Sequence, residues 1–284
     1  LISSNAQKMG HVVVYFDAES ALDEKFLMKA GCDVSDMIYV QAISVEKVLG
    51  EIQNLMDEYP ETQFLFVWDS IAATPSEKDI EGDFNPQSSM AVKPRIFSKA
   101  FPKITIPLAN QQCTLVLINQ LKTNITSNIA EAMTTPWIAP GGKAIGYFSS
   151  QRIWLTKRKA KASYVNNNKG HRIGTEVKVK IEKSRFGTEG RTCTFKIVWG
   201  SDVGIQDEES WFTAIKLSGT NKMKQGGAWY TIKDKKGKDH KFQATKWLER
   251  LKDPDFREAV CTIMDEEVIQ RFDSTQEEID LKDE

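Results

Sequence analysis

The chain has 284 residues, with 38 Lys and Arg against 39 Asp and Glu, and hydrophobic residues make up 40% of it. This size and composition are typical of a folded protein with one large or two modest domains. They exclude a wholly disordered, collagen-like or disulfide-stapled chain. No apolar run approaches the roughly 20 residues that a membrane span needs, and the first residues do not form a signal peptide. We therefore expect a cytoplasmic protein with no membrane partner.

The charge is unevenly distributed along the chain. Residues 141–200 contain fourteen Lys or Arg against three Glu, whereas residues 252–284 contain four basic and twelve acidic residues. A basic segment favours a polyanionic partner, because each Lys or Arg placed on a phosphate releases counterions. A solvated surface has the same composition, so charge alone leaves both interpretations open.

Apolar runs of strand length alternate with helical patterns in the first 120 residues. We expect buried strands over residues 11–16, 64–68 and 113–118, and helices over residues 21–30 and 45–59. Each strand is followed by polar residues, which are Asp17 to Ser20, Asp69 with Ser70, and Asn119 with Gln120. The carboxyl ends of parallel strands form a ligand crevice at one edge of a sheet. The pattern therefore predicts an α/β fold with a mostly parallel sheet, helices on both faces and a site at the strand ends.

The pattern changes after Gln120. Residues 121–140 are polar, which for a connection of this length indicates a functional loop or disorder. Residues 152–158, 175–183 and 192–199 are expected to form an antiparallel extension. We place a domain boundary after residue 205, so that residues 1–205 form the core and residues 206–284 a small α+β domain with an acidic tail. Trp154, Trp199, Trp229 and Trp247 are expected in the core rather than on a base-stacking surface.

Carboxylates at the strand ends are the strongest chemical signal. Asp69 follows an apolar strand, as in the Walker B arrangement, where the carboxylate holds Mg²⁺ beside a nucleotide phosphate. A helix cap or turn would also explain a single Asp. Glu19 at a second strand end could activate a water that attacks the γ-phosphate of ATP, and the amide of Gln120 at a third could sense that phosphate. The three positions together favour a nucleotide site.

Six separated motifs resemble the RecA family of homologous-recombination ATPases. They match in order and spacing over nearly the whole chain, and they are Tyr15–Asp23, Trp68–Ala73, Asp79–Gly82, Ile118–Gln120, Gly141–Ala144 and Gly227–Tyr230. The segment Glu182–Arg185 is similar to the phage, UvsX-like branch of that family. The resemblance implies a RecA-like P-loop ATPase core with ATP and Mg²⁺ as cofactors. It also implies a homo-oligomeric helical filament on single-stranded DNA that exchanges strands with double-stranded DNA.

The resemblance also assigns roles to residues of the nucleotide site. Glu19 matches the glutamate that activates the hydrolytic water, and Asp69, with Ser70, matches the Walker B metal side. Gln120 matches the γ-phosphate sensor. Asp23 and Phe26 match positions beside adenine. Two further cations match those that one filament subunit presents to the ATP of its neighbour, and they are Lys183 and Arg185.

The resemblance implies two DNA-binding loops, over residues 81–90 and 121–140. Met90 lies at the tip of the first loop, where an apolar side chain could wedge between bases. A helix that carries Arg95 and Ser98 is expected after this loop, and Pro94 must either lie in its first turn or break it. The remaining positions that match DNA contacts are Arg95, Ser98, Lys122, Thr123, Gly141 and Gly142, with Lys157 and Arg158 as a secondary site.

The chain departs from the family in one major respect. It contains no Gly-x-x-x-x-Gly-Lys-[Ser/Thr] sequence, the loop whose backbone N–H groups and Lys hold phosphates. We expect a chain truncated after that loop, and an ATP-dependent recombinase in complete form. Two alternatives stay open: a non-catalytic DNA-binding filament subunit without a P-loop, and a hexameric helicase of the same superfamily.

Overall fold

The structure, a computed structural model, describes residues 1–82, 91–157, 161–199 and 204–269. These form two compact units, residues 1–149 and residues 150–284. The boundary that the sequence predicts after residue 205 lies inside the second unit and stays a prediction. None of the helices in the described ranges has the length and apolar composition of a membrane span.

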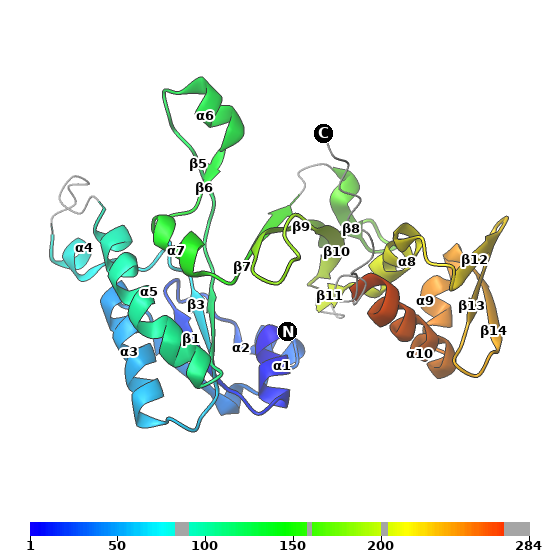
Figure 1. The fold of residues 1–284 in the computed structure, drawn as a ribbon, viewed down its shortest axis with the longest axis horizontal. Coiled ribbons are helices and arrows are strands. Elements are labelled where there is room, and N and C mark those ends of the chain that lie inside the picture. The colour runs from blue at the N-terminus through cyan, green and yellow to red at the C-terminus, as the bar shows by residue number, and fades with distance from the viewer. Residues whose placement is uncertain (83–90, 158–160, 200–203, 270–284) are drawn as a thin grey trace, which may run out of the picture. The chain divides into compact units, whose positions relative to one another are not determined.

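The first unit is built on a four-stranded parallel sheet with the order β2-β1-β3-β4 (Figure 1). The strands are β1 (Val12–Asp17), β2 (Met37–Gln41), β3 (Phe64–Asp69) and β4 (Thr114–Leu117). The helices around them are α1 (Ile2–Lys8), α2 (Glu24–Lys29), α3 (Val45–Glu58), α4 (Glu77–Glu81), α5 (Val92–Asn110) and α7 (Lys143–Phe148). The three strands expected from the apolar runs are confirmed, and so is the helix over residues 45–59, but β4 lies at the sheet edge and none of its residues is buried.

The two faces of this sheet are covered differently. On one face, Phe16, Phe66 and Trp68 pack against α3 and α5 in the largest core cluster. On the other face, Val13 and Val67 pack with Ala6 of α1 in a smaller cluster. Strand β1 pairs with β2 on one side and β3 on the other, and chain order reverses at this point. In open α/β sheets the ligand crevice lies at such a reversal, at the carboxyl ends of the strands.

Several local predictions are corrected by the structure. The helix expected over residues 21–30 is the shorter α2, which starts only at Glu24 because the Asp23 side chain accepts hydrogen bonds from the amides of Lys25 and Phe26 and caps the helix there. Pro94 lies in the first turn of α5, which is one of the two placements that the sequence left open. Part of the polar loop is ordered: β5 (Lys122–Thr123) pairs with β6 (Trp137–Ile138), and α6 (Ile129–Thr134) lies between them as an arm that extends from the unit (Figure 1).

The second unit contains an antiparallel sheet followed by a smaller α+β module. The larger sheet has the order β11-β10-β9-β7, with β8 paired to β9. Its strands are β7 (Gln151–Lys157), β8 (Tyr164–Asn166), β9 (Arg172–Ser184), β10 (Thr192–Val198) and β11 (Gly204–Gln206). The antiparallel extension expected from the sequence is therefore confirmed.

The α+β module has its own core around Phe242, Trp247 and Phe256. Its strands form the order β12-β13-β14, and they are β12 (Met223–Gly226), β13 (Trp229–Lys233) and β14 (Asp239–Gln243). Its helices are α8 (Glu208–Ser218), α9 (Trp247–Arg250) and α10 (Pro254–Ile263), the last of which continues into a π-helix over Met264–Ile269. The expectation of four core tryptophans is wrong for two of them: Trp199 is 46% and Trp229 is 44% exposed.

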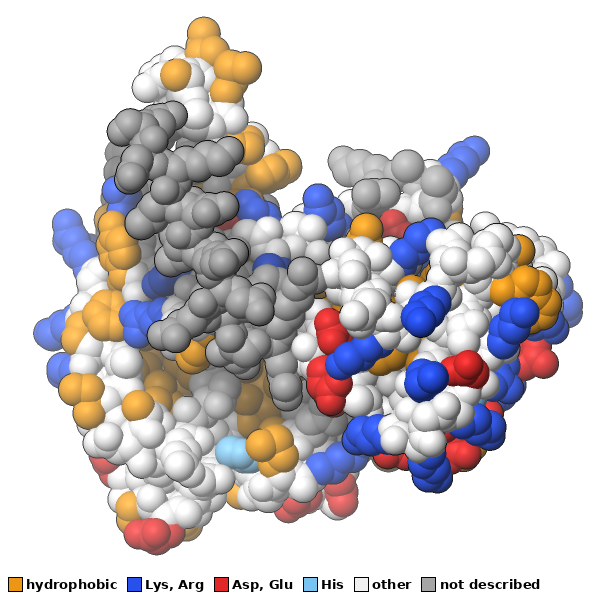
Figure 2. All heavy atoms as spheres, turned by 45° about the vertical axis from the view of Figure 1, so that its right-hand side comes forward, with side chains coloured by type: hydrophobic (Ala, Val, Ile, Leu, Met, Phe, Trp, Pro, Cys, Tyr) orange, Lys and Arg blue, Asp and Glu red, His pale blue; other side chains and the backbone are white. Residues whose placement is uncertain are grey.

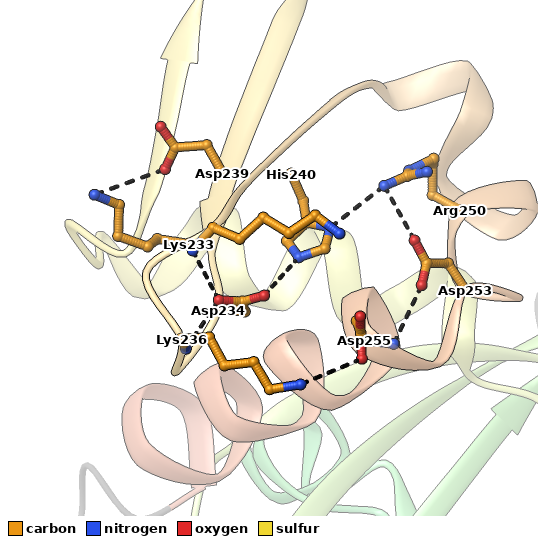
Figure 3. Close-up of polar contacts among 9 residues, drawn as sticks. Lys233, Asp234, Lys236, Asp239, His240, Arg250, Asp253 and Asp255 are labelled. Carbon is orange, nitrogen blue, oxygen red and sulfur yellow. Dashed lines mark hydrogen bonds and ion pairs between the residues drawn. The ribbon is translucent and has the colours of Figure 1, made fainter.

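A buried hydrogen-bond network ties the β13–β14 turn to α9 (Figure 3). The His240 ring is almost wholly buried and contacts Asp234 Oδ2 through Nε2 at 3.1 Å. Arg250 Nη2 lies 3.4 Å from Nδ1 of the same ring. Because a guanidinium only donates, Nδ1 accepts and Nε2 carries the proton that is donated to Asp234. The other oxygen of Asp234 accepts from the backbone amides of Lys236 and Lys238.

This network predicts that acid weakens the module. The hydrogen bond from His240, followed by the amide of Lys238, lowers the pKa of Asp234 below its ordinary value of 3.8. A carboxylate with a lowered folded pKa stabilises the protein above the unfolded pKa, and this is lost as pH falls through the folded pKa. In urea unfolding from pH 7 to pH 2.5, Asp234→Asn should therefore have a lower free energy of unfolding than wild type at pH 7. This difference in unfolding free energy should narrow as the pH falls below about 4.

The matched control is Asp239→Asn, which removes an exposed carboxylate that lies 3.7 Å from Lys233. An exposed pair of this kind contributes little, so this variant should show almost no such difference at any pH. If the difference in unfolding free energy between wild type and Asp234→Asn is the same at pH 2.5 as at pH 7, packing and not the charge of Asp234 causes the loss of stability.

Candidate nucleotide and DNA site

Polar side chains from three neighbouring strands converge at the carboxyl edge of the parallel sheet. The Ser70 hydroxyl donates to Oε1 of Glu19 at 3.0 Å, and Gln120 Nε2 lies 3.5 Å from the same oxygen. Asp17 and Asp69 are register partners on β1 and β3. The structure thus brings together Glu19, Asp69, Ser70 and Gln120, although Gln120 is 101 residues from Glu19.

Ser70 is held in place by its surroundings. Its side chain is almost wholly buried, and its hydroxyl oxygen accepts a hydrogen bond from the amide of Ala73 at 3.3 Å. The hydroxyl proton is therefore directed at Glu19. Glu19 itself is exposed at the open edge of the sheet, where a water molecule has access to its carboxylate. This arrangement suits a general base that is oriented by a neutral donor.

Asp17 organises the turn that carries Glu19, a role that sequence reasoning missed. It is buried, and its Oδ1 accepts from the amides of Glu19 and Ser20, both at 2.9 Å. Its Oδ2 accepts from the amide of Leu22 at 3.3 Å and from the Tyr39 hydroxyl at 3.1 Å. With four donors, this carboxylate serves the local structure. The position of an Asp directly before the polar turn was the only available signal in the sequence.

Tyr15 makes a second contact that the sequence did not reveal. Its hydroxyl donates to Oδ2 of Asp69 at 2.7 Å, across the β1–β3 pairing. Burial, followed by this hydrogen bond and the nearby carboxylates, raises the pKa of Tyr15. The phenol therefore keeps its proton at neutral pH and acts as a donor to Asp69.

The residues at this edge fit one side of a magnesium site. Within the described ranges, no three His, Cys, Asp or Glu side chains group as a full set of metal ligands. Mg²⁺ is usually bound through one or two carboxylates, waters and substrate phosphates, so a full protein set is not required. Asp69 is only partly buried and has Oδ2 engaged by Tyr15. It therefore fits the role of the carboxylate on the metal side.

The two positions matched to adenine lie on α2. Asp23 caps this helix, and Phe26, in its first turn, is 47% exposed. An exposed aromatic ring can stack on a planar base. The Asp23 carboxylate already accepts two backbone hydrogen bonds, so its function in the structure is that of a cap.

The described positions matched to DNA contacts in the first unit lie on three segments. Arg95 and Ser98 are exposed on α5, although the Ser98 hydroxyl donates to the carbonyl of Pro94 at 2.7 Å. Lys122 and Thr123 are exposed on β5. The arm that β5 begins also exposes apolar side chains (orange at the top of Figure 2), which are Ile125, Ile129 and Met133. Met90 and residues 83–89 of the first loop lie outside the described residues.

Gly141 and Gly142 pack directly on the start of α5. Both have positive φ, and a Cβ on Gly142 would lie 2.8 Å from Cβ of Pro94. The close approach therefore requires glycine at this position. Asn119 Nδ2 donates to the carbonyl of Pro140 at 2.8 Å and closes the base of the arm. These contacts connect the end of β4, the arm and the first turn of α5 within one unit.

The remaining matched cations lie in the second unit. Lys183, near the end of β9, is a register partner of Arg152 on β7, and Arg185 follows two residues later. Burial, followed by the positive charges of Arg185 and Arg152, lowers the pKa of Lys183. Arg152 thus belongs to this cationic group, and sequence reasoning missed it. Lys157 is exposed at the end of β7, and Arg158 lies outside the described residues.

The fold and the strand-end carboxylates define a class of parallel α/β proteins with a ligand site at the reversal of strand order. A family described as the RecA N-terminal domain matches residues 1–205, and the chain belongs to this family. It is 28% identical over 247 residues to Protein RecA of Haemophilus ducreyi, covering 87% of this chain and 62% of that protein. It is also 28% identical over 237 residues to Protein RecA of Francisella tularensis subsp. novicida, covering 83% of this chain and 61% of that protein.

Proposed function

We propose that this chain is part of an ATP-dependent homologous-recombination protein that acts in DNA repair and recombination, in the cytoplasm. The observation that carries the proposal is the convergence of Ser70, Glu19 and Gln120 at one carboxylate oxygen, beside Asp69, at the strand-order reversal. Membership of the RecA N-terminal domain family supports the same function. We also propose that the chain belongs to the phage, UvsX-like branch.

In this proposal each residue at the sheet edge has a distinct task. Asp69 would hold Mg²⁺, which neutralises charge on the phosphates of ATP. Glu19, oriented by the Ser70 hydroxyl, would accept a proton from the attacking water. Gln120 would respond to the γ-phosphate and change the position of the arm that begins at Lys122. Phe26 would stack on adenine.

The DNA partner would lie along the exposed segments that surround α5. Arg95, Lys122 and Thr123 would contact the phosphates of single-stranded DNA, and the close-packed backbone at Gly141 and Gly142 would allow a phosphate to approach. Lys157 and Arg158 would contact double-stranded DNA. Lys183 and Arg185 would face the ATP of the next subunit in a helical filament, where cations stabilise the transferred phosphoryl group.

The chain spans about 62% of the length of Protein RecA of Haemophilus ducreyi, and it contains no Gly-x-x-x-x-Gly-Lys-[Ser/Thr] sequence. We propose that a segment outside these 284 residues supplies the phosphate-binding loop. The test is a P-loop fusion, in which the N-terminal part of a RecA relative, including that loop, is joined to Leu1.

ATP hydrolysis is measured with Mg²⁺ and single-stranded DNA for the fusion and for the chain alone. We expect DNA-stimulated hydrolysis and helical filaments in electron micrographs for the fusion. DNA binding by both proteins without hydrolysis by either would reject the ATPase proposal in favour of a non-catalytic filament subunit. Closed six-membered rings would instead indicate a helicase.

A further inference from the structure

Among the described residues, Tyr15 forms the shortest hydrogen bond to a strand-end carboxylate of the parallel sheet. Its hydroxyl lies 2.7 Å from Oδ2 of Asp69, and it reaches that oxygen from β1, where its register partner on β3 is Val67. The Tyr15 ring packs against the smaller core cluster with Val13 and Val67. A phenylalanine would satisfy this packing equally well, so the hydroxyl itself has to be explained by its contact with Asp69.

The chemistry of this contact suits a metal ligand. A donor on Oδ2 restricts rotation of the Asp69 carboxylate and leaves Oδ1 to be directed at a cation. Outer-shell hydrogen bonds of this type fix the orientation of ligating carboxylates. A neutral phenol, unlike Lys or Arg, does this without adding a positive charge that would repel the cation.

We propose that Tyr15 is a positioning residue for Asp69, holding its carboxylate in the orientation that binds a divalent cation. The inference rests on the proposed function, because that function makes Asp69 the metal-side carboxylate. Tyr15 touches neither substrate nor metal and acts only through Asp69. Its hydroxyl is thus a determinant of cation affinity at the sheet edge.

The chain contains a matched control for the loss of a tyrosine hydroxyl. Tyr39 donates to Oδ2 of Asp17 at 3.1 Å, also at a strand end of the same sheet. Asp17 accepts from three backbone amides as well, so its oxygens are occupied by the protein. Tyr15→Phe and Tyr39→Phe therefore remove the same group, a tyrosine hydroxyl. The first removes it beside Asp69, the proposed metal ligand, and the second beside Asp17, whose oxygens the protein already occupies.

The experiment titrates the 284-residue chain with Mn²⁺ and measures free and bound Mn²⁺ by electron paramagnetic resonance, with Mg²⁺ as competitor. Wild type should show one saturable, Mg²⁺-sensitive class of bound Mn²⁺, and Asp69→Asn should lose it. Tyr15→Phe should raise the dissociation constant about tenfold, the effect expected when an outer-shell partner is removed. Tyr39→Phe should bind Mn²⁺ as wild type does. Near-ultraviolet circular dichroism and thermal unfolding follow the fold of each variant.

The outcomes separate failure of the inference from failure of the proposed function. If Asp69→Asn abolishes binding while Tyr15→Phe binds Mn²⁺ like wild type, the metal site stands and the role of Tyr15 is rejected. If Tyr15→Phe and Tyr39→Phe weaken Mn²⁺ binding equally, the role of Tyr15 is also rejected. An unfolded Tyr15→Phe variant rejects this role too, because the hydroxyl would then serve the stability of the fold. If Asp69→Asn and wild type bind Mn²⁺ equally, the metal role of Asp69 fails and the inference fails with it.

Discussion

Replacement of Glu19 by glutamine in the P-loop fusion is expected to lower the rate of ATP hydrolysis by about 10²–10⁴-fold, the contribution typical of a general base. Glutamine keeps the size of the side chain and an oxygen that accepts from the Ser70 hydroxyl, now 3.0 Å from Glu19 Oε1. It removes the negative charge and therefore the ability to accept a proton from water. Phosphate release with Mg²⁺ and single-stranded DNA measures this effect.

The matched control is Glu24→Gln, which removes an exposed carboxylate in the first turn of α2, five residues along the chain. This control should hydrolyse ATP at the wild-type rate. Both variants should still form filaments on DNA, because neither change removes a DNA-binding or packing side chain. Undiminished hydrolysis by Glu19→Gln would remove Glu19 from the role of base.

A Ser70→Ala variant distinguishes the base from the group that orients it. The hydroxyl contact with Glu19 is lost, while the carboxylate remains. Hydrolysis should fall less than in Glu19→Gln, and combining the two changes should cost little more than Glu19→Gln alone. Additive losses would mean that Ser70 acts independently of Glu19.

Replacement of Trp68 by alanine is expected to lower the free energy of unfolding of the first unit by about 3–5 kcal/mol, the usual cost of deleting a large aromatic side chain from a core. Trp68 is fully buried on β3, and its ring lies 5.9 Å from that of Phe97 on α5. Its Nε1 donates to Oγ1 of Thr74 at 2.8 Å, so the side chain also anchors the turn after Asp69.

Urea unfolding followed by fluorescence and circular dichroism measures this loss. The control Trp137→Ala deletes a tryptophan that is 47% exposed on β6, and it should change the unfolding free energy by less than about 0.5 kcal/mol. Thr74→Val removes the hydrogen-bond acceptor without a large change of volume, and it should cost about 1–3 kcal/mol. A Trp68→Ala variant within about 1 kcal/mol of wild type would show that the core repacks around the deleted ring.

The sequence alone determined the class of fold and the positions of the polar strand ends. Strands β1 and β3 were predictable because strands covered on both faces need unbroken apolar runs, such as Phe64–Trp68. Strand β4 also has an apolar run, although it lies at the sheet edge and is only partly buried. Strand β2 was not predicted, although Met37–Val40 is an apolar run that contains β-branched and aromatic residues. The short elements of the arm were missed because they are brief, and β5 is polar and exposed along its whole length.

Only the tertiary structure decided which polar groups meet and which oxygen each donor reaches. Tyr15 and Asp69 are 54 residues apart, and Tyr39 and Asp17 are 22 residues apart, so no local pattern links either pair. The parallel register sets these contacts, because it places Asp17 beside Asp69 and turns Tyr15 toward the same sheet face. Asp17 serves the local structure because three backbone amides donate to it, and the proposed role of Asp69 in metal binding depends on its having an oxygen without such donors. The number of amides that donate to each carboxylate depends on the folded path of the chain after each strand, and residue type alone does not specify it.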